Sequence, residues 1–271
     1  MLKARFYEQH SVFLHSMFAL RLSIVILFLL PQIQFSQNNK QHYYHNNGWL
    51  MYFGNHAFSK HIGLHAEVQL RRHNIVLEPQ QLLLRGGINF YTGQNSFFTL
   101  GYAYVETYPY GELPSPITFP EHRIWQQFQA KLMLKRMEMI SRFRLEQRYV
   151  HAPTINIHTG KFETGDGVYT NRFRLLTRFS LPINKKEIID HAIYISAYDE
   201  LFVNFGKNVG LNVFDQNRAY FALGYKVPVV GRVELGYLYQ TIIKSDGIRI
   251  ENNHTLQVSI TNNLSFRKKS D

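Results

Sequence analysis

The chain has 271 residues and no cysteine, which excludes a disulfide-stapled miniprotein, a thiolate metal site and a thiol nucleophile. Its slightly negative mean hydropathy is too polar for a bundle of transmembrane helices, yet 15% of its residues are aromatic, which favours β structure. The formal net charge is +11, but the bases are spread along the chain and interleaved with acids. Nucleic-acid binding needs a contiguous basic surface, so we expect no nucleic acid among the partners.

The first 36 residues have the layout of a secretory signal peptide. The apolar run 22–30 follows Arg21 and is shorter than the ~20 residues with which a helix spans a bilayer. A small residue, Ser36, precedes a polar stretch, so we predict cleavage after it. The alternative for this segment is a short N-terminal membrane anchor.

The domain organisation follows from this leader. Met17 lies just before the apolar run, which leaves a misassigned start codon as an explanation for residues 1–16. Residues 37–271 then form the mature chain, and we predict that they fold as a single domain.

Beyond Gly48 the chain alternates between polar and apolar residues with a period of two. A strand has this period because its successive side chains point to opposite faces. The segment 141–149 carries charged residues on one face and mostly apolar residues on the other, and 64–71, 172–181 and 255–261 repeat the pattern. Each segment is therefore predicted to be a strand with one polar and one apolar face.

Turn signals between such runs divide the chain into about eleven strands. Soluble strands cluster near five or six residues, whereas a tilted strand that crosses a membrane needs about 9–11. Because the expected strands are long, they predict an antiparallel transmembrane β-barrel, with a soluble β-sandwich as the alternative. Their ranges are 48–58, 64–73, 80–91, 96–110, 121–136, 139–150, 168–182, 191–203, 214–227, 232–244 and 251–263.

The connections between these strands alternate in length, as expected when tight periplasmic turns lie at one end of a barrel and extracellular loops at the other. If the long loops lie outside, the strand at 48–58 starts from the outside, and a secreted chain needs one more crossing before it. We therefore predict a short polar strand at 38–47 and a barrel of twelve strands, with ten as the alternative. The mostly short breaks are 59–63, 92–95, 137–138, 183–190 and 228–231, and the mostly long ones are 74–79, 111–120, 151–167, 204–213 and 245–250.

The charged faces of the strands are expected to line the barrel lumen. An Arg or Lys on the lipid face costs roughly 2–4 kcal/mol near the bilayer midplane, so the charged faces point inward and the Phe and Leu faces outward. Two interpretations stay open: an Arg–Glu network that fills the lumen, and an anion-attracting pore or binding cavity. The predicted lumen residues are Glu67, Arg71, Arg85, Glu121, Arg123, Lys131, Arg142, Arg144, Glu146, Arg148, Arg172, Arg174, Arg178, Glu200, Arg218, Arg232 and Glu234.

An ordered set of short motifs runs through the same strands: Glu121-His122-Arg123 with Trp125 and Gln126-Gln127, Arg142-x-Arg144-x-Glu146-x-Arg148, Asn171-Arg172-x-Arg174, Asp199-Glu200, Gln216-Asn217-Arg218 and Gly236-Tyr237. Over roughly 48–263 this set resembles the bacterial outer-membrane proteins catalogued as domain of unknown function 2490. The resemblance implies a barrel in a Gram-negative outer membrane, without a known activity, and it transfers no catalytic residue.

Signals for an enzyme are weak. The sequence has no Gly-x-Ser-x-Gly elbow, no P-loop, no Gly-x-Gly-x-x-Gly and no His-Glu-x-x-His, so we predict no catalytic residue, no metal site and no cofactor. A lipid or lipopolysaccharide hydrolase embedded in the outer membrane is the alternative function. Ser196, His191, His122 and Glu121 are residues of the right type for such a site, but nothing in the sequence selects them.

The sequence thus predicts an outer-membrane β-barrel domain at 37–271 with a charged, Arg/Glu-lined lumen and a structural, narrow transport or binding role. The expected partners are outer-membrane lipid, the barrel-assembly machinery during insertion, and a small anionic solute.

Overall fold

The computed structural model describes residues 40–266. The predicted signal peptide and cleavage site lie outside these residues. Within them, no helix is long and apolar enough to cross a bilayer.

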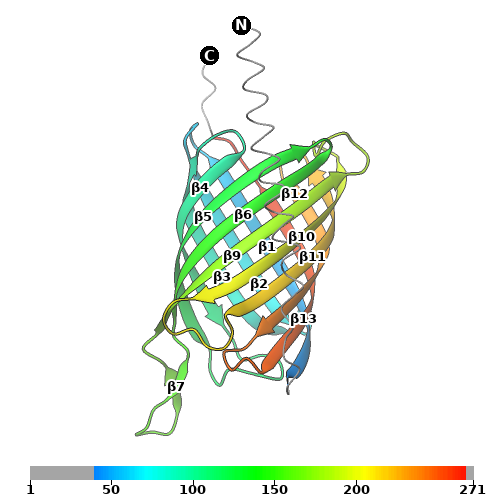
Figure 1. The fold of residues 1–271 in the computed structure, drawn as a ribbon. Helices are drawn as coiled ribbons and strands as arrows, with labels where there is room; N and C mark the ends of the chain where they lie inside the picture. Colours follow the sequence, from blue (N-terminus) through cyan, green and yellow to red (C-terminus); the bar gives the residue numbers. More distant parts are fainter. Residues whose placement is uncertain (1–39, 267–271) are drawn as a thin grey trace. The chain divides into compact units, whose positions relative to one another are not determined.

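The described residues form the predicted all-β fold, a closed barrel in which neighbouring strands pair antiparallel at all but one position (Figure 1). A short two-stranded hairpin, β7 (Pro153–Ile155) and β8 (Phe162–Thr164), lies outside the barrel sheet. The barrel strands are β1 (Gln41–Ala57), β2 (Ile62–His73), β3 (Glu78–Tyr91), β4 (Ser96–Thr107), β5 (Phe119–Leu134), β6 (Met137–Val150), β9 (Val168–Pro182), β10 (Ile193–Phe205), β11 (Phe214–Val227), β12 (Gly231–Ile243) and β13 (Arg249–Asn262).

The barrel has eleven strands among the described residues, not twelve, and the separate strand expected at 38–47 is wrong. Residues 41–47 are the first part of β1, which continues without a break. The expected boundary falls at Asn47 and Gly48, whose residue types are typical of turns. In the structure Asn47 donates a hydrogen bond to Asn253 inside the barrel at 3.2 Å. Gly48 leaves room for the backbone of Ile75, because an added Cβ would lie 1.9 Å from the Ile75 carbonyl oxygen.

The odd strand number determines how the barrel closes. The first and last strands, β1 and β13, run in the same direction and pair parallel from Gln41↔Arg249 to Gly54↔Asn262. Bacterial outer-membrane barrels usually have an even number of strands and close antiparallel. Because β1 and β13 are parallel, β1 begins at one end of this barrel and β13 finishes at the other.

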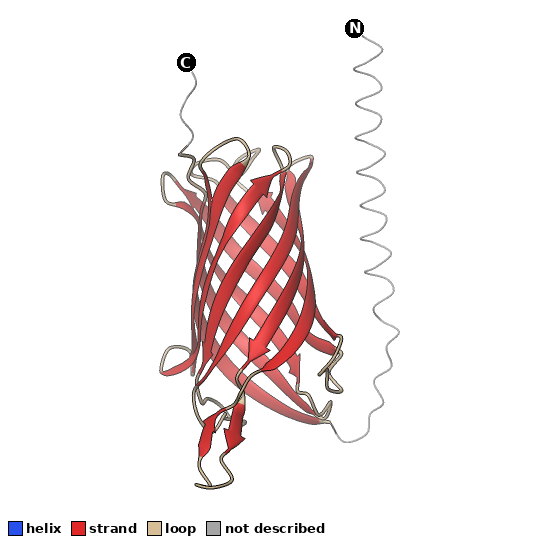
Figure 2. Ribbon diagram, turned by 90° about the vertical axis from the view of Figure 1, so that its left-hand side faces the viewer, coloured by secondary structure: helices blue, strands red, loops and turns tan. Residues whose placement is uncertain are grey.

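The two ends of the barrel differ in their connections (Figure 2). We call them the turn end and the loop end; the latter carries the β7–β8 hairpin, at the bottom of both views. The turn end has the connections 58–61, 92–95, 135–136, 183–192 and 228–230, and the loop end has 74–77, 108–118, 151–167, 206–213 and 244–248.

The pleat of the strands sorts side chains by polarity, with ionised residues inside and apolar residues outside. Large aromatic rings also point inward, and glycines make room for them. The indole of Trp125 lies over Gly101 and Gly87, where added Cβ atoms would come within 2.6 Å and 3.1 Å of its Cζ2. The interior is therefore filled by rings as well as by ion pairs.

Candidate functional site

Every predicted lumen residue lies in a barrel strand and is buried or half-buried. The buried ones are Glu67, Arg85, Glu121, Arg123, Arg144, Glu146, Arg172, Arg174, Glu200, Arg218 and Glu234. The half-buried ones are Arg71, Lys131, Arg142, Arg148, Arg178 and Arg232.

Glu146 on β6 is the centre of a layer of ion pairs across the middle of the lumen. Its Oε1 accepts from Arg174 Nη1 at 2.7 Å and from Arg85 Nη2 at 3.2 Å. Its Oε2 accepts from Arg172 Nη2 at 2.7 Å, and Arg123 Nη1 lies 4.0 Å away. A carboxylate with 0% exposure thus joins arginines from three other strands.

Two further carboxylates extend this layer on either side. Glu200 on β10 accepts from Arg174 Nη2 and Arg142 Nη2, both at 2.7 Å. Glu67 on β2 accepts from Arg85 Nη1 at 2.6 Å. We refer to Glu67, Arg85, Glu146, Arg172, Arg174 and Glu200 as the ion-pair layer.

A cavity lies on each side of this layer. The one toward the turn end has a volume of about 1040 Å³, and the one toward the loop end has about 220 Å³. The two share Gln69, Arg174 and Arg218 in their linings and are otherwise lined by different side chains. Glu146 and Trp125 line neither cavity, so they form part of the partition between them.

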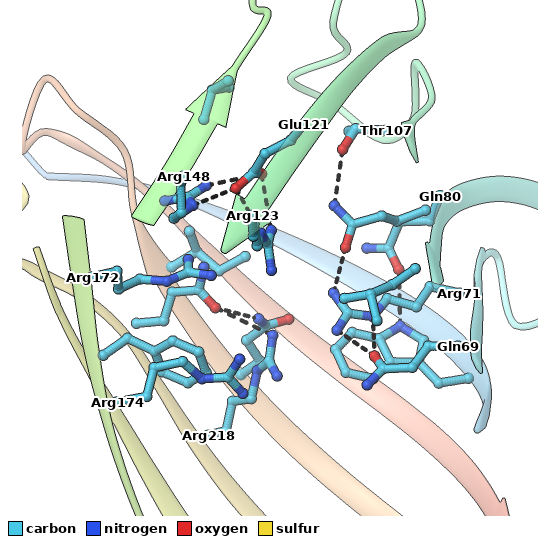
Figure 3. Close-up of a pocket in the computed structure, with 18 of the residues that line it drawn as sticks. Gln69, Arg71, Gln80, Thr107, Glu121, Arg123, Arg148, Arg172, Arg174 and Arg218 are labelled. Atoms are coloured by element: carbon cyan, nitrogen blue, oxygen red, sulfur yellow. Dashed lines mark hydrogen bonds and ion pairs between the residues drawn. The ribbon is translucent and has the colours of Figure 1, made fainter. Parts of the chain in front are cut away.

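The loop-end cavity is strongly basic (Figure 3). Arg71 lies on one side of it with Gln69 and Gln80, and Arg172, Arg174 and Arg218 lie on the other. Within residues 40–266, Glu121 is the only acidic side chain that lines this cavity. Two arginines share its carboxylate: Arg123 Nε and Arg148 Nε donate to its Oε1 at 2.6 Å and 2.5 Å.

Arg71 differs from the arginines of the ion-pair layer because amide oxygens hold it. Its Nε and Nη2 donate to Gln69 Oε1 at 3.0 Å and 2.6 Å, and its Nη1 donates to Gln81 Oε1 at 2.6 Å. Among residues 40–266 it forms no ion pair with a carboxylate. Its guanidinium lies 4.2 Å from the ring centroid of Trp49, whose own N–H donates to Gln80.

Arg218 and Arg144 are held in a similar way. Arg218 lies 5.2 Å from the Trp49 ring, with Gln216 Oε1 at 3.4 Å and the nearest carboxylate, that of Glu200, at 3.8 Å. Arg144, beside the turn-end cavity, donates from Nε and Nη2 to Gln127 Oε1, and its Nη1 has no hydrogen-bond partner in the described part of the chain. Glutamines thus orient Arg71 and Arg144 without neutralising them, and Arg218 has only a long ion pair with Glu200.

Two β-bulges shape the loop-end cavity. A register shift beside Arg71 leaves Gln80 as an extra residue in β3, so that Gln80 and Gln81 both line the cavity. A second shift, between β10 and β11, leaves Asp215 as an extra residue, and its Oδ2 accepts from Arg172 Nη1 at 2.9 Å. Bulges of this kind re-aim side chains at barrel rims and beside functional sites.

The loop 108–118 contributes Tyr110 to the cavity lining. The Tyr110 hydroxyl donates to Glu251 Oε2 at 3.5 Å, and Lys244 Nζ lies 2.5 Å from Glu251 Oε1. Burial, with the Glu251 carboxylate as a further cause, raises the pKa of Tyr110. The hydroxyl is therefore a neutral hydrogen-bond donor, and Lys244 neutralises Glu251.

Sequence reasoning missed several inward residues. Glu138 fell in an expected break, but it lies in β6 and bonds Arg232 Nη1 at 2.5 Å. Asp215 lies three residues before Arg218, so strict alternation would place the two side chains on opposite faces of the strand. The bulge places both inside the barrel. Glu251 and Trp125 have the correct parity for the lumen, so alternation alone could have identified them.

The residues considered for a hydrolase do not form a catalytic pair. Glu121 points into the lumen, whereas its neighbour His122 bonds the exposed Tyr102 hydroxyl at 2.5 Å. Ser196 is buried and bonds Ser180, and His191 bonds Tyr225. Over residues 40–266 there is also no cluster of three or more side chains that could hold a metal ion.

The fold and its interior define a class of protein, a closed β-barrel whose lumen contains a buried Arg–Glu network. A family model described as "Protein of unknown function (DUF2490)" matches residues 46–251, and the chain belongs to this family. No curated protein and no solved structure matches the chain.

Proposed function

We propose that the protein is a β-barrel of a bacterial outer membrane, that the ion-pair layer closes its lumen, and that the loop-end cavity serves binding. The observation that carries the proposal is the inverted distribution of polarity: ionised side chains are buried inside the barrel and apolar side chains are exposed around its outside.

The apolar outer surface extends around the whole barrel. Contiguous apolar patches above a few hundred Å² are rare on soluble monomers, whereas a lipid-facing barrel requires an apolar band. Each strand contributes at least one exposed large apolar residue: Leu50, Leu70, Leu84, Leu100, Ile124, Phe143, Phe173, Ile193, Leu223, Leu235 and Leu256.

Polar groups on the outer surface bond one another, which also supports a lipid environment, because lipid offers them no partner. Gln126 and Gln147 exchange hydrogen bonds at 3.1 Å and 3.2 Å. Asn217 donates to both carboxylate oxygens of Asp199, at 3.1 Å and 2.9 Å.

The membrane location is tested by placing a charge on the outer surface. Leu100→Arg should lower the free energy of unfolding in phospholipid vesicles by roughly 2–4 kcal/mol if the site lies near the midplane, and by less toward either interface. Ile157→Arg is the control, because Ile157 is 87% exposed on the loop between β7 and β8. Equal stability of the two variants, or recovery of the protein in the soluble periplasmic fraction without detergent, would contradict the proposal.

The closed lumen is tested by conductance in planar bilayers. We expect the wild-type barrel to give no steady current, because Glu146 and its arginines lie between the two cavities. A steady, ion-selective channel would show that the layer leaves a continuous water path.

A further inference from the structure

We propose that the loop-end cavity binds a small, multiply charged oxyanion through Arg71 and Arg218. This deepens the proposed function and rests on the binding role given to that cavity. A bound oxyanion also explains why glutamines hold arginines in the loop-end cavity.

The positive charge of Arg71 faces amide oxygens rather than a carboxylate. An ionised group removed from water is costly unless an opposite charge compensates it. Gln69 and Gln81 supply hydrogen bonds to Arg71 without a negative charge, although a glutamate of nearly the same shape would supply both. A bound anion would provide the missing charge.

The lining of the loop-end cavity holds more basic than acidic side chains. Two guanidiniums, those of Arg123 and Arg148, share the Glu121 carboxylate. Arg71 forms no ion pair in the part of the chain that the structure describes, and Arg218 approaches Glu200 no closer than 3.8 Å. The lining is therefore short of more than one negative charge, which favours a dianion or a higher anion over chloride.

The guanidiniums of Arg71 and Arg218 are held in place before any ligand binds. A guanidinium has five N–H groups, and the hydrogen bonds of Arg71 to Gln69 and Gln81 use three of them, so two remain for a ligand. Trp49 holds Arg71 and Arg218 at 4.2 Å and 5.2 Å from its ring centroid, and Gln80 fixes the indole. Donors that are oriented in advance lose little entropy on binding, and guanidiniums match the oxygens of phosphate and carboxylate groups.

The volume of the loop-end cavity limits the size of its ligand. The cavity of about 220 Å³ lies below the roughly 300 Å³ at which pockets for drug-sized ligands begin. Pyrophosphate and citrate have this scale and the required charge.

Isothermal titration of the detergent-solubilised full-length protein with inorganic pyrophosphate, and separately with citrate, tests the proposal. We expect saturable binding with one site per chain, and the tighter probe identifies the preferred acid group. Arg71→Gln should weaken binding about 10- to 100-fold, as expected for loss of a charge-assisted hydrogen bond. No saturable binding of either probe to the wild type would overturn the proposal.

A matched pair of isosteric variants separates binding from folding. Gln81→Glu gives Arg71 an internal carboxylate and should abolish binding while the barrel stays folded. Gln127→Glu does the same for Arg144, which lines the turn-end cavity, and should bind as the wild type does. Equal loss of binding in both variants would contradict a site at Arg71.

The outcomes also separate this inference from the proposed function. Titration in detergent does not depend on a membrane or on a closed lumen. A conducting barrel that still binds pyrophosphate would overturn the closed lumen alone, and a closed barrel without binding would overturn the oxyanion site alone.

Discussion

The ion-pair layer and the loop-end cavity use the same side chain in different ways. In the layer, Arg85, Arg172 and Arg174 bond the carboxylate of Glu146 directly. In the cavity, Arg71 is held by the amide oxygen of Gln69 and by a second glutamine. The difference shows that a carboxylate both orients and neutralises an arginine, whereas an amide orients it and leaves its charge available.

We expect the largest loss of stability when the carboxylate at the centre of the ion-pair layer is removed. Glu146→Gln leaves several arginines uncompensated and should cost about 3–5 kcal/mol in the free energy of unfolding, the usual cost of breaking a buried ion pair. Denaturant titration of the refolded protein measures it. A loss below about 1 kcal/mol would mean that water already screens the layer.

Packing beside the layer comes next in expected effect. Gly101→Ala would place a Cβ 2.3 Å from the carbonyl oxygen of Gly86 and 2.6 Å from Trp125 Cζ2, so we expect a loss of about 1–3 kcal/mol from overpacking. Gly86→Ala is the control, because its Cβ would meet no atom within 4 Å. The same denaturant titration compares the two, and similar losses would contradict the packing assigned to Trp125.

Giving Arg71 a carboxylate partner, as the arginines of the ion-pair layer have, should increase stability. Gln81→Glu places a carboxylate against Arg71 and should raise the free energy of unfolding by about 1 kcal/mol, the difference between a neutral and a charge-assisted hydrogen bond. The thermal midpoint without added anions measures the change. A lower midpoint would indicate that the charge of Arg71 is already compensated.

The smallest effect is expected at the rim, in the connection 244–248. The backbone N–H of Arg249 is the main cause that lowers the pKa of Asp246 from 3.8 to about 2, and the N–H of Ile248 adds to it. Because the folded pKa is the lower one, this contribution to stability is present above about pH 4 and is lost as the pH falls toward 2.

Thermal midpoints of wild type and Asp246→Asn between pH 2 and 6 measure this contribution. We expect the wild type to be slightly more stable at pH 6 and the two curves to converge near pH 2. A gap that does not change with pH would contradict an electrostatic origin. Anion binding at neutral pH should be the same for both proteins, because Asp246 does not line the cavity.

Much of this interior could be predicted from alternation. A period of two assigns Arg142, Arg144, Glu146 and Arg148 to one face, and burial follows because the barrel closes around that face. Alternation does not identify partners, since these depend on the curvature of the closed sheet. Arg144 therefore bonds Gln127 on the neighbouring strand rather than Glu146 on its own strand.

Other features could not be predicted because they depend on local breaks in the pattern. A bulge shifts the alternation by one residue, so Asp215 and Gln80 point inward although a strict period of two would place them outside. Local turn signals indicate about eleven strands, the number in the structure. The twelfth strand was expected from an extra crossing and an even count, and the parallel pairing of β1 with β13 removes the need for an even count.

The most direct test of the difference between the two regions is the reactivity of individual arginines toward methylglyoxal, followed by mass spectrometry of the modified peptides. We expect Arg71 to react faster than Arg174, whose N–H groups are engaged by Glu146 and Glu200, and we expect pyrophosphate to protect Arg71. Equal rates for Arg71 and Arg174, with no protection by pyrophosphate, would contradict both expectations.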